Sequence, residues 1–322
     1  MAPSKPRILV TRRMPPRVTA RLERDYDATL NPQDRIMSSD ELIAAAAGHA
    51  GILCCSSEKF TPAVIAQLPD TVRIVSTFSV GYEHIDVPAA RTRGIAVTNT
   101  PEVLTDATAD IAMLCLLGAA RRASEGDRMV RGGNWNAWTT TMMLGVHLGG
   151  KRLGIYGMGR IGRAVAQRGR GFGMSIHYHN RSRLSPDLEL GASYHASAEE
   201  LLPHCDFLSI NAPSTAETVK FLNAERIALL PDGAVVANTA RGNMVDDEAL
   251  IAALRSGKVA AAGLDVFDGE PRINQAYMAL DNTLLLPHIG SATHETRDAM
   301  GFCCLDNMDA FFAQRECPNA LT

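Results

Sequence analysis

Short apolar runs alternate with alanine-rich segments of helical periodicity along most of the chain. Nearly continuous runs of valine, isoleucine and leucine that are separated by helices are typical of parallel strands covered on both faces. The pattern therefore predicts an α/β protein with doubly wound parallel sheets. The predicted strands are residues 7–11, 51–55, 73–77, 95–98, 152–156, 175–179, 207–211, 234–238, 260–265 and 283–286.

Residues 101–150 depart from this alternation. Residues 101–122 form one long apolar helix candidate, and Pro101 suits its first turn. Residues 124–150, which we call the arm, contain both tryptophans, Trp135 and Trp138, and are too long for an ordinary connection. Aromatic side chains on such a segment fit a subunit contact. A surface loop that packs its own tryptophans is the alternative.

Composition narrows the class of protein. The chain has 322 residues, which corresponds to about two domains of ordinary size. A hydrophobic content of 46% excludes an intrinsically disordered chain. With 35 acidic and 32 basic residues, the net charge of −3 argues against a broad basic surface for nucleic acid.

Targeting and metal-binding signals are also missing from the sequence. The longest apolar stretch, residues 111–120, is shorter than the roughly 18 residues that span a bilayer. The apolar run at residues 8–10 is too short for the core of a signal peptide. Seven cysteines without metal-ligand spacing favour reduced thiols. We therefore expect a cytoplasmic protein that has no membrane, nucleic-acid or metal partner.

A glycine-rich turn carries the first functional signal. Residues 157–162 match the pattern G-x-G-x-x-G and directly follow a predicted strand. Gly157 permits a tight turn, Gly159 lets a pyrophosphate approach the backbone, and Gly162 lets the next helix pack on the strand. That helix offers free N–H groups and the positive end of its dipole to phosphates. The context favours a dinucleotide site over a purely structural glycine turn.

The end of the next predicted strand bears on which dinucleotide binds. It carries Asn180-Arg181-Ser182-Arg183, and Asn180 lies 23 residues after Gly157. An NAD site has an acidic residue here for the ribose hydroxyls, whereas an NADP site has a cation. Two guanidinium groups and a hydroxyl suit a phosphate dianion. The turn therefore favours NADP(H) over NAD(H), and a solvated surface turn is the alternative.

Three later predicted strands are each followed by a residue capable of chemistry, namely Arg241, Glu270 and His288. Ligands bind outside the carboxyl ends of the strands in an open α/β sheet, so these residues can converge. The arginine can hold a substrate carboxylate and polarise a 2-oxo group. The histidine can exchange a proton with the carbonyl oxygen, while the glutamate orients the imidazole and favours its charged form. Each of these residues also has a structural alternative. Arg241 could form an ion pair with Asp246 or Asp247, Glu270 could start a turn, and His288 could be a buried histidine with satisfied hydrogen bonds.

The ordered set of motifs resembles the D-isomer-specific 2-hydroxyacid dehydrogenase family over nearly the whole chain. The motifs are the glycine turn at 157–162, Asn238-Thr239-Ala240-Arg241-Gly242, Leu264-Asp265-Val266-Phe267 with Glu270-Pro271, and Pro287-His288-Ile289-Gly290-Ser291-Ala292-Thr293. Gly132-Gly133-Asn134-Trp135-Asn136-Ala137-Trp138 on the arm is similar to the glyoxylate/hydroxypyruvate reductase branch. The arginine-bearing turn after Asn180 points to the same branch.

This resemblance implies two doubly wound domains, one flavodoxin-like and one Rossmann-like, with the active site in the cleft between them. The substrate-binding domain would comprise residues 1–99 and 289–322. The NAD(P)-binding domain would be inserted at residues 100–288 and would carry the arm. Members of the family are usually homodimers built through the coenzyme domains, and in the reductase branch an arm tryptophan reaches the partner's active site. Trp138 is expected in that role ahead of Trp135.

The resemblance also assigns roles position by position. Arg241, Glu270 and His288 match the catalytic set, and Arg241 and His288 are also expected to contact the substrate. The backbone N–H groups of Val80 and Gly81 match a carboxylate-binding loop. The other expected substrate contacts are Ser57, Ser291 and Trp138. The expected coenzyme contacts are Thr108, Gly157, Met158, Gly159, Arg160, Ile161, Gly162, Asn180, Arg181, Ser182, Arg183, Asn211, Pro213, Thr218, Thr239, Ala240, Asp265 and Gly290.

We therefore expect an NADPH-dependent reductase that converts glyoxylate and hydroxypyruvate into glycolate and D-glycerate. A dehydrogenase of the D-lactate or 3-phosphoglycerate type is an alternative. The chain ends at Thr322, after the last predicted helix, so we expect it to lack the regulatory domain of long phosphoglycerate enzymes. A dinucleotide-sensing corepressor on the same fold is a further alternative, but such proteins tend to carry extended tails.

Overall fold

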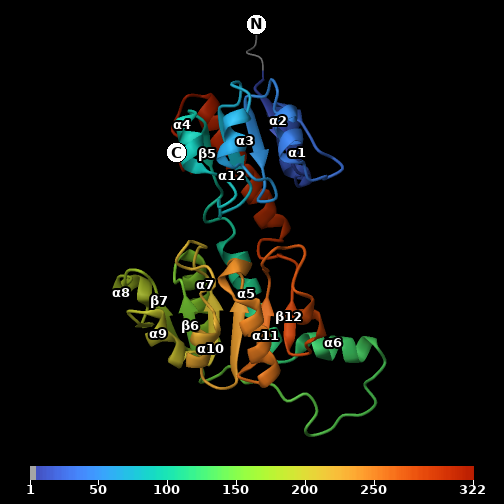
Figure 1. Ribbon diagram of the computed structural model, residues 1–322, viewed down its shortest axis with the longest axis vertical. Helices are drawn as coiled ribbons and strands as arrows, with labels where there is room; N and C mark the ends of the chain where they lie inside the picture. Colours follow the sequence, from blue (N-terminus) through green and yellow to red (C-terminus); the bar gives the residue numbers. More distant parts are fainter. Residues whose placement is uncertain (1–4) are drawn as a thin grey trace. The chain divides into compact units, whose positions relative to one another are not determined.

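The computed structural model describes residues 5–322, and the chain divides into two compact units (Figure 1). One unit comprises Met1–Leu104 and Ala292–Thr322, and the other comprises Thr105–Ser291. The second unit is thus an insertion in the first. Its bounds place residues 100–104 in the first unit and residues 289–291 in the second, which differs by a few residues from the division expected from the sequence.

The described part of the first unit contains a five-stranded parallel sheet with the strand order β2-β1-β3-β4-β5. This is the order of flavodoxin-like doubly wound folds. The strands are β1 (Arg7–Val10), β2 (Asp27–Thr29), β3 (Gly51–Cys54), β4 (Ile74–Thr77) and β5 (Ala96–Thr98). The helices are α1 (Pro16–Asp25), α2 (Ser39–Ala45), α3 (Pro62–Gln67), α4 (Val87–Thr92) and α12 (His294–Phe312).

The second unit contains a seven-stranded parallel sheet, within the described residues, with the order β12-β11-β10-β9-β6-β7-β8. The strand order reverses between β6 and β9, as in Rossmann-type sheets. The strands are β6 (Arg152–Tyr156), β7 (Ser175–His179), β8 (Ser193–Tyr194), β9 (Phe207–Ile210), β10 (Ala234–Asn238), β11 (Val259–Leu264) and β12 (Thr283–Leu285). The helices are α5 (Thr105–Ala120), α6 (Ala123–Arg131), α7 (Arg160–Gly171), α8 (Pro186–Glu189), α9 (Ala198–Leu201), α10 (Ala224–Leu229) and α11 (Asp247–Ser256), with 3₁₀ turns at Leu202–His204, Gly242–Met244 and Gln275–Ala279.

Both faces of each sheet are buried, which explains the continuous apolar runs. Successive strand residues point to opposite faces, and in β10 Val235 packs in one hydrophobic core while Val236 packs in the other. In the first unit, Ile8 and Leu9 of β1 are divided between two cores in the same way. The prediction of an α/β fold with doubly wound parallel sheets is therefore confirmed.

Three local features differ from the sequence prediction. Strands β2 and β8 were not predicted because they are edge strands of three and two residues with no fully buried position. Helix α5 begins at Thr105 rather than at residue 101, because the chain turns at Glu102, whose φ of 74° is incompatible with a helix. The arm begins with α6, which is separated from α5 by the left-handed residue Arg122, and only the part after α6 lacks helix and strand (Figure 1).

The structure also bears on membrane and metal partners. Within residues 5–322, none of the helices combines the length and apolar character needed to cross a membrane. The same residues contain no group of three or more histidine, cysteine or acidic side chains arranged to hold a metal ion.

Candidate active site

The glycine turn lies where the strand order of the second sheet reverses, between the carboxyl end of β6 and the start of α7. Gly157 has a φ of 92°, and a Cβ atom there would come within 2.5 Å of the backbone nitrogen of Ala212. A Cβ atom on Gly162 would lie 2.3 Å from the carbonyl oxygen of Gly157. Both positions therefore require glycine. A Cβ atom on Gly159 would meet nothing within 4 Å, so the space beside the N-terminus of α7 is open.

Asn180 binds directly to this turn. The backbone N–H of Met158 donates to Asn180 Oδ1 over 2.6 Å. Since a backbone N–H can only donate, this bond directs the carbonyl oxygen of Asn180 toward the turn and leaves its NH₂ group to face elsewhere. A carboxylate at this position would present only acceptors, whereas Asn180 presents two N–H donors. Arg181 and Ser182 follow it and are exposed.

Two polar atoms near this edge of the sheet are buried without a hydrogen-bond partner among the described residues, namely Asn211 Oδ1 after β9 and Thr239 Oγ1 after β10. Buried polar groups are nearly always hydrogen-bonded, so such atoms call for a bound partner. The backbone N–H of Asn211 donates to the carbonyl of Tyr156, which places Asn211 beside the end of β6. These residues fit a coenzyme that lies along the carboxyl ends of the strands.

The remaining expected coenzyme contacts surround the same sheet edge or its loops. Thr108 of α5 is buried beside Gly290, since a Cβ atom on the glycine would lie 3.4 Å from its methyl group. The hydroxyl of Thr218 donates to the carbonyl of Pro213 over 2.8 Å, so these two residues fix one loop. Ala240 is held by a bond from its N–H to Asn238 Oδ1 of 3.0 Å.

His288 and Glu270 form a direct pair. His288 Nδ1 lies 2.5 Å from Glu270 Oε1, and the second carboxylate oxygen accepts the backbone N–H of Phe267 over 3.1 Å. Although burial acts to raise the pKa of Glu270, the hydrogen bond and the charge of His288 lower it below its usual value. Glu270 is therefore an ionised acceptor, and Nδ1 of His288 carries the proton. The side chain of His288 is 46% exposed, so Nε2 is accessible.

The loop that carries His288 is anchored by Asp265. His288 itself has a φ of 55°, a left-handed conformation that is uncommon outside glycine. The two following N–H groups, those of Ile289 and Gly290, donate to the two carboxylate oxygens of Asp265, each over 2.8 Å. Asp265 is 1% exposed, and this burial raises its pKa, whereas the two backbone N–H donors act to lower it.

Arg241 reaches the same neighbourhood through a close backbone contact. A Cβ atom on the next residue, Gly242, would lie 1.8 Å from the carbonyl carbon of Phe267, so the loops after β10 and β11 touch. The amide of Asn238 donates to the carbonyl oxygen of Arg241 over 2.9 Å. The guanidinium donates to the carbonyl of Ala240 over 2.7 Å, and its charge helps to lower the pKa of Glu270. The second unit thus brings Arg241, Glu270 and His288 to adjoining loops.

The expected carboxylate loop lies in the first unit, after β4. The carbonyl oxygen of Val80 accepts the amide of Asn99 over 2.8 Å, and that of Gly81 accepts the hydroxyl of Ser79 over 2.6 Å. Among the described residues, the backbone N–H groups of Val80 and Gly81 have no acceptor. This arrangement fixes the loop and leaves two donors for an anion.

Ser57 belongs to a buried network at the same sheet edge. Its hydroxyl donates to Glu58 Oε1 over 2.8 Å and accepts from the Arg12 guanidinium over 2.9 Å. Glu58 is only 2% exposed and also accepts from the hydroxyl of Thr11 and the N–H of Cys55. The sequence did not mark Glu58, because its flanking residues read as a polar loop. The hydroxyl proton of Ser57 is therefore used in the hydrogen bond to Glu58.

The other two expected substrate contacts differ in exposure. Ser291 is partly buried directly after the Asp265-anchored loop. Trp138 is 73% exposed and Trp135 is 55% exposed, on a stretch of the arm in which residues 131–140 are all exposed. Large apolar side chains at this exposure have no covering partner within the described chain.

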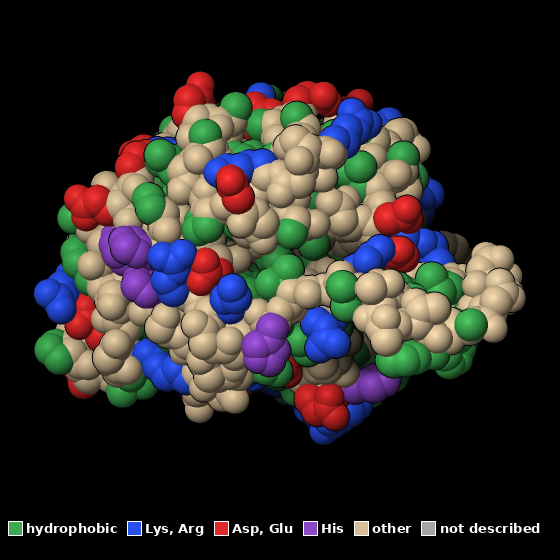
Figure 2. All heavy atoms as spheres, turned by 90° about the horizontal axis from the view of Figure 1, so that it is seen from below, with side chains coloured by type: hydrophobic (Ala, Val, Ile, Leu, Met, Phe, Trp, Pro, Cys, Tyr) green, Lys and Arg blue, Asp and Glu red, His purple; other side chains and the backbone are tan. Residues whose placement is uncertain are grey.

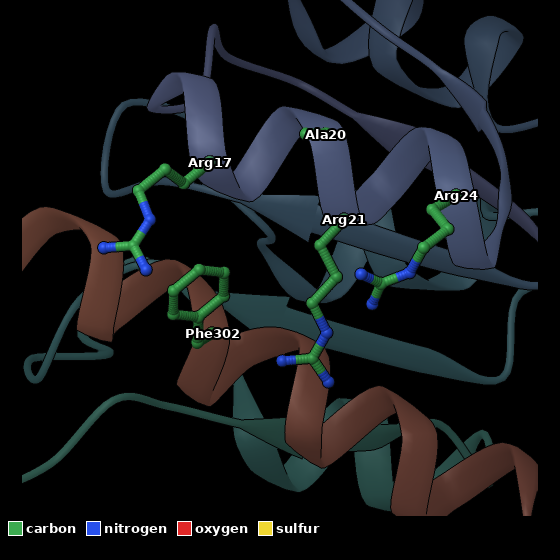
Figure 3. A pocket seen from close by; sticks show the side chains of 5 residues that line it. All are labelled: Arg17, Ala20, Arg21, Arg24 and Phe302. Carbon is green, nitrogen blue, oxygen red and sulfur yellow. The ribbon is translucent and has the colours of Figure 1, made fainter.

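The molecular surface has no dominant charge on the face seen in Figure 2, where basic and acidic side chains are interspersed. A groove of about 640 Å³ in the first unit is lined by Arg17, Arg21, Arg24, Ala20 and Phe302, and Figure 3 shows Arg17 and Arg21 on either side of the Phe302 ring. The arginines are paired with acidic side chains, as in the bond of 2.6 Å from Arg21 to Asp309. The groove lacks unpaired charge and is separate in sequence from the residues described above.

The comparison with known proteins identifies the family. The model of the D-isomer specific 2-hydroxyacid dehydrogenase, NAD binding domain matches residues 113–290. The chain is 44% identical over 320 residues to a glycerate dehydrogenase of Hyphomicrobium methylovorum, which covers 99% of both chains. The chain belongs to the D-2-hydroxyacid dehydrogenase family. The resemblance inferred from the sequence motifs is thereby confirmed.

Two further relatives define the branch of this dehydrogenase family. The chain is 43% identical over 312 residues to a glyoxylate reductase of Pyrococcus furiosus, covering 95% of this chain and 92% of the relative. It also resembles the structure of an NADPH-dependent glyoxylate/hydroxypyruvate reductase of Sinorhizobium meliloti in complex with NADP and malonate. That structure has a TM-score of 0.88 and 36% identity, and the match covers 99% of this chain and 97% of the other.

Proposed function

We propose that this dehydrogenase reduces glyoxylate and hydroxypyruvate to glycolate and D-glycerate with NADPH. The observation that carries the proposal is the 2.5 Å pair between His288 Nδ1 and Glu270 Oε1, together with the contact between the Glu270 loop and the loop bearing Arg241. A proton donor, its orienting carboxylate and a guanidinium on adjoining loops form a set suited to a 2-oxo acid. The names of the glycerate dehydrogenase and glyoxylate reductase relatives support the same substrates.

The chemistry follows from the roles of these three side chains. A bound reduced nicotinamide supplies the hydride to the carbonyl carbon. Arg241 binds the substrate carboxylate and polarises the 2-oxo group with charged N–H donors. His288 donates the proton on Nε2 to the carbonyl oxygen as negative charge develops there. Glu270 accepts a hydrogen bond from the Nδ1–H group, which fixes the ring orientation and stabilises the imidazolium before the transfer.

Each unit contains groups that suit a small carboxylate substrate. The free N–H groups of Val80 and Gly81 suit a carboxylate, as does the guanidinium of Arg241. Ser291 would contact the substrate next to His288. In a homodimer assembled through the arms, Trp138 would close the partner's active site. Ser57 would shape the loop after β3 through its hydrogen bonds and would not donate to the substrate, because its hydroxyl already donates to Glu58.

The preference for NADPH rests on the turn after β7. The side-chain oxygen of Asn180 accepts the N–H of Met158, so its NH₂ group is left to donate to a ligand. Arg181 and Ser182 are exposed beside it. This set offers donors and positive charge, which suit a 2′-phosphate better than they suit two ribose hydroxyls. The S. meliloti reductase, whose structure contains NADP, supports this coenzyme for the branch.

The test is an absorbance assay at the nicotinamide band. Purified protein is supplied with NADPH or NADH and with glyoxylate, hydroxypyruvate, pyruvate or phosphohydroxypyruvate. We expect the highest kcat/KM with NADPH and the first two acids. Highest activity with pyruvate or phosphohydroxypyruvate would favour the D-lactate or phosphoglycerate type instead. Absence of turnover with every acid, despite coenzyme binding, would favour a dinucleotide-sensing protein.

A further inference from the structure

The two arginines of the turn after β7 are held in different ways. The Arg183 guanidinium binds both oxygens of Glu189, with Nε to Oε1 at 2.8 Å and one terminal nitrogen to Oε2 at 3.1 Å. The Glu189 side chain is 8% exposed, whereas that of Arg183 is 64% exposed. Arg181 is exposed, and among the described residues its side chain makes no hydrogen bond or ion pair. One arginine is therefore tied to the protein and the other is available.

Glu189 connects the turn to the rest of the unit. The buried hydroxyl of Tyr178, on β7, donates to Glu189 Oε1 over 2.6 Å and accepts the backbone N–H of Leu184 over 3.0 Å. The carbonyl of Glu189 accepts from Arg170 of α7 over 2.8 Å. The turn is thus fastened to β7, α7 and α8 through a single acidic residue.

The pKa shifts of this cluster favour a neutral Tyr178, an ionised Glu189 and a charged Arg183. Burial, with the hydrogen bond to Glu189, raises the pKa of Tyr178 to about 12. The bond to Arg183 lowers the pKa of Glu189, and the reciprocal bond raises the pKa of Arg183. The guanidinium of Arg183 also lies 5.8 Å over the ring of Tyr194. Its positive charge is already balanced by a carboxylate, so it adds little net charge for a coenzyme phosphate.

We propose that Arg181 reads the 2′-phosphate of NADPH, and that Glu189 with Arg183 forms a positioning pair that holds the turn in place. This inference rests on the proposed preference for NADPH. The sequence alone assigned phosphate binding to both arginines, whereas this proposal gives phosphate binding to Arg181 and positioning to Arg183. Glu189 was not marked by the sequence, because it follows Asp187 and Leu188 in what reads as a solvated segment.

The test measures the binding of two coenzyme fragments, adenosine 2′,5′-bisphosphate and 5′-AMP, by titration calorimetry. The variants are Arg181→Ala, Arg183→Ala, Glu189→Gln and the double variant of the last two. Arg255→Ala is the matched control, because Arg255 is an exposed arginine of the same unit at the far end of α11. We expect Arg181→Ala to weaken the bisphosphate by about 10-fold or more, as for a lost charged hydrogen bond, and to leave 5′-AMP nearly unchanged.

The direction in which Glu189→Gln changes the affinity for the bisphosphate distinguishes a positioning role of Arg183 from direct binding of the phosphate. For a positioning pair, Glu189→Gln and Arg183→Ala both weaken the bisphosphate, and the double variant loses no more than either single one. If Arg183 itself bound the phosphate, Glu189→Gln would release its charge and tighten the bisphosphate. Tightening, or a bisphosphate-selective loss confined to Arg183→Ala, would overturn the division of roles. Equal affinity of the wild type for both fragments would instead overturn the NADPH preference and, with it, the role of Arg181.

Discussion

The buried carboxylate of Asp265 accepts the backbone N–H of Gly290 over 2.8 Å, two residues after His288. Its other oxygen accepts the N–H of Ile289 at the same distance. These bonds fix the backbone directly after the left-handed residue His288, and they thereby fix the position of its imidazole ring. A carboxylate on β11's loop therefore positions a proton donor that follows β12.

The first prediction concerns this anchor. Asp265→Asn keeps the shape of the side chain but replaces one acceptor oxygen with an NH₂ group that faces a backbone N–H. We expect the free energy of unfolding to fall by about 1–3 kcal/mol, the cost of leaving a buried group unsatisfied. We also expect kcat to fall, because the His288 loop loses its anchor. Urea denaturation and steady-state kinetics measure the two effects.

The matched control for the anchor is Asp232→Asn. Asp232 pairs with Lys258, but its side chain is 92% exposed, so this change should alter stability by less than about 1 kcal/mol and leave kcat unchanged. Wild-type stability and kcat in Asp265→Asn would contradict the anchoring role.

The proton donor itself gives the second prediction. His288→Asn removes the imidazole, and asparagine tolerates the φ of 55° at this position better than alanine does. We expect kcat to fall by about 10²–10⁴-fold, the usual contribution of general acid catalysis. Coenzyme affinity should change little, and fluorescence titration with NADPH checks this. A kcat within a few-fold of the wild type would exclude His288 as the acid.

Arg241 should act mainly on the substrate carboxylate. Arg241→Ala is expected to raise KM for glyoxylate and to lower kcat, since the guanidinium both binds the carboxylate and polarises the carbonyl. Added guanidinium ion should restore part of the activity, because the space of the missing side chain can admit it. The control is guanidinium added to the wild type, which should not be activated. Unchanged KM together with no rescue would remove Arg241 from the substrate site.

Much of this arrangement was accessible from the sequence. The residues that follow β10, β11 and β12 could be placed at one sheet edge because parallel strands end together, and the glycine turn could be placed by its spacing. The short edge strands β2 and β8 lack an apolar run, so no pattern indicates them. Glu58 and Glu189 lie in segments that read as polar loops, and only the folded chain reveals that hydrogen-bond donors surround them. The left-handed backbone of His288 likewise depends on Asp265, which is 23 residues away in sequence.

The Glu270–His288 pair predicts a pH dependence of stability. The pKa of Glu270 is lower in the folded protein than its ordinary value of 4.5, which holds in the unfolded chain. The ionised form therefore stabilises the fold above pH 4.5, and this contribution is lost as the pH falls through the lower, folded-state pKa. Glu270→Gln lacks this ionisation. In urea denaturation, the stability difference between the wild type and Glu270→Gln should be largest above pH 4.5 and should shrink as the pH falls below that value. A difference that stays constant across this range would contradict the pairing.

The exposed apolar side chains of the arm predict a subunit contact. Trp138 and Leu144 are 73% and 68% exposed, and a homodimer would cover such a surface. We expect light scattering to give the mass of a dimer for the wild type and a smaller mass for Trp138→Arg with Leu144→Arg. Met278→Arg is the control, since Met278 is 61% exposed on the same unit but lies outside the arm.

Mixed dimers test whether Trp138 completes the partner's site. Subunits with Trp138→Ala and subunits with His288→Asn should each be nearly inactive alone, and a dimer of one of each should regain one working site. Failure of the mixed dimer to exceed the activity of its parents would confine Trp138 to its own subunit.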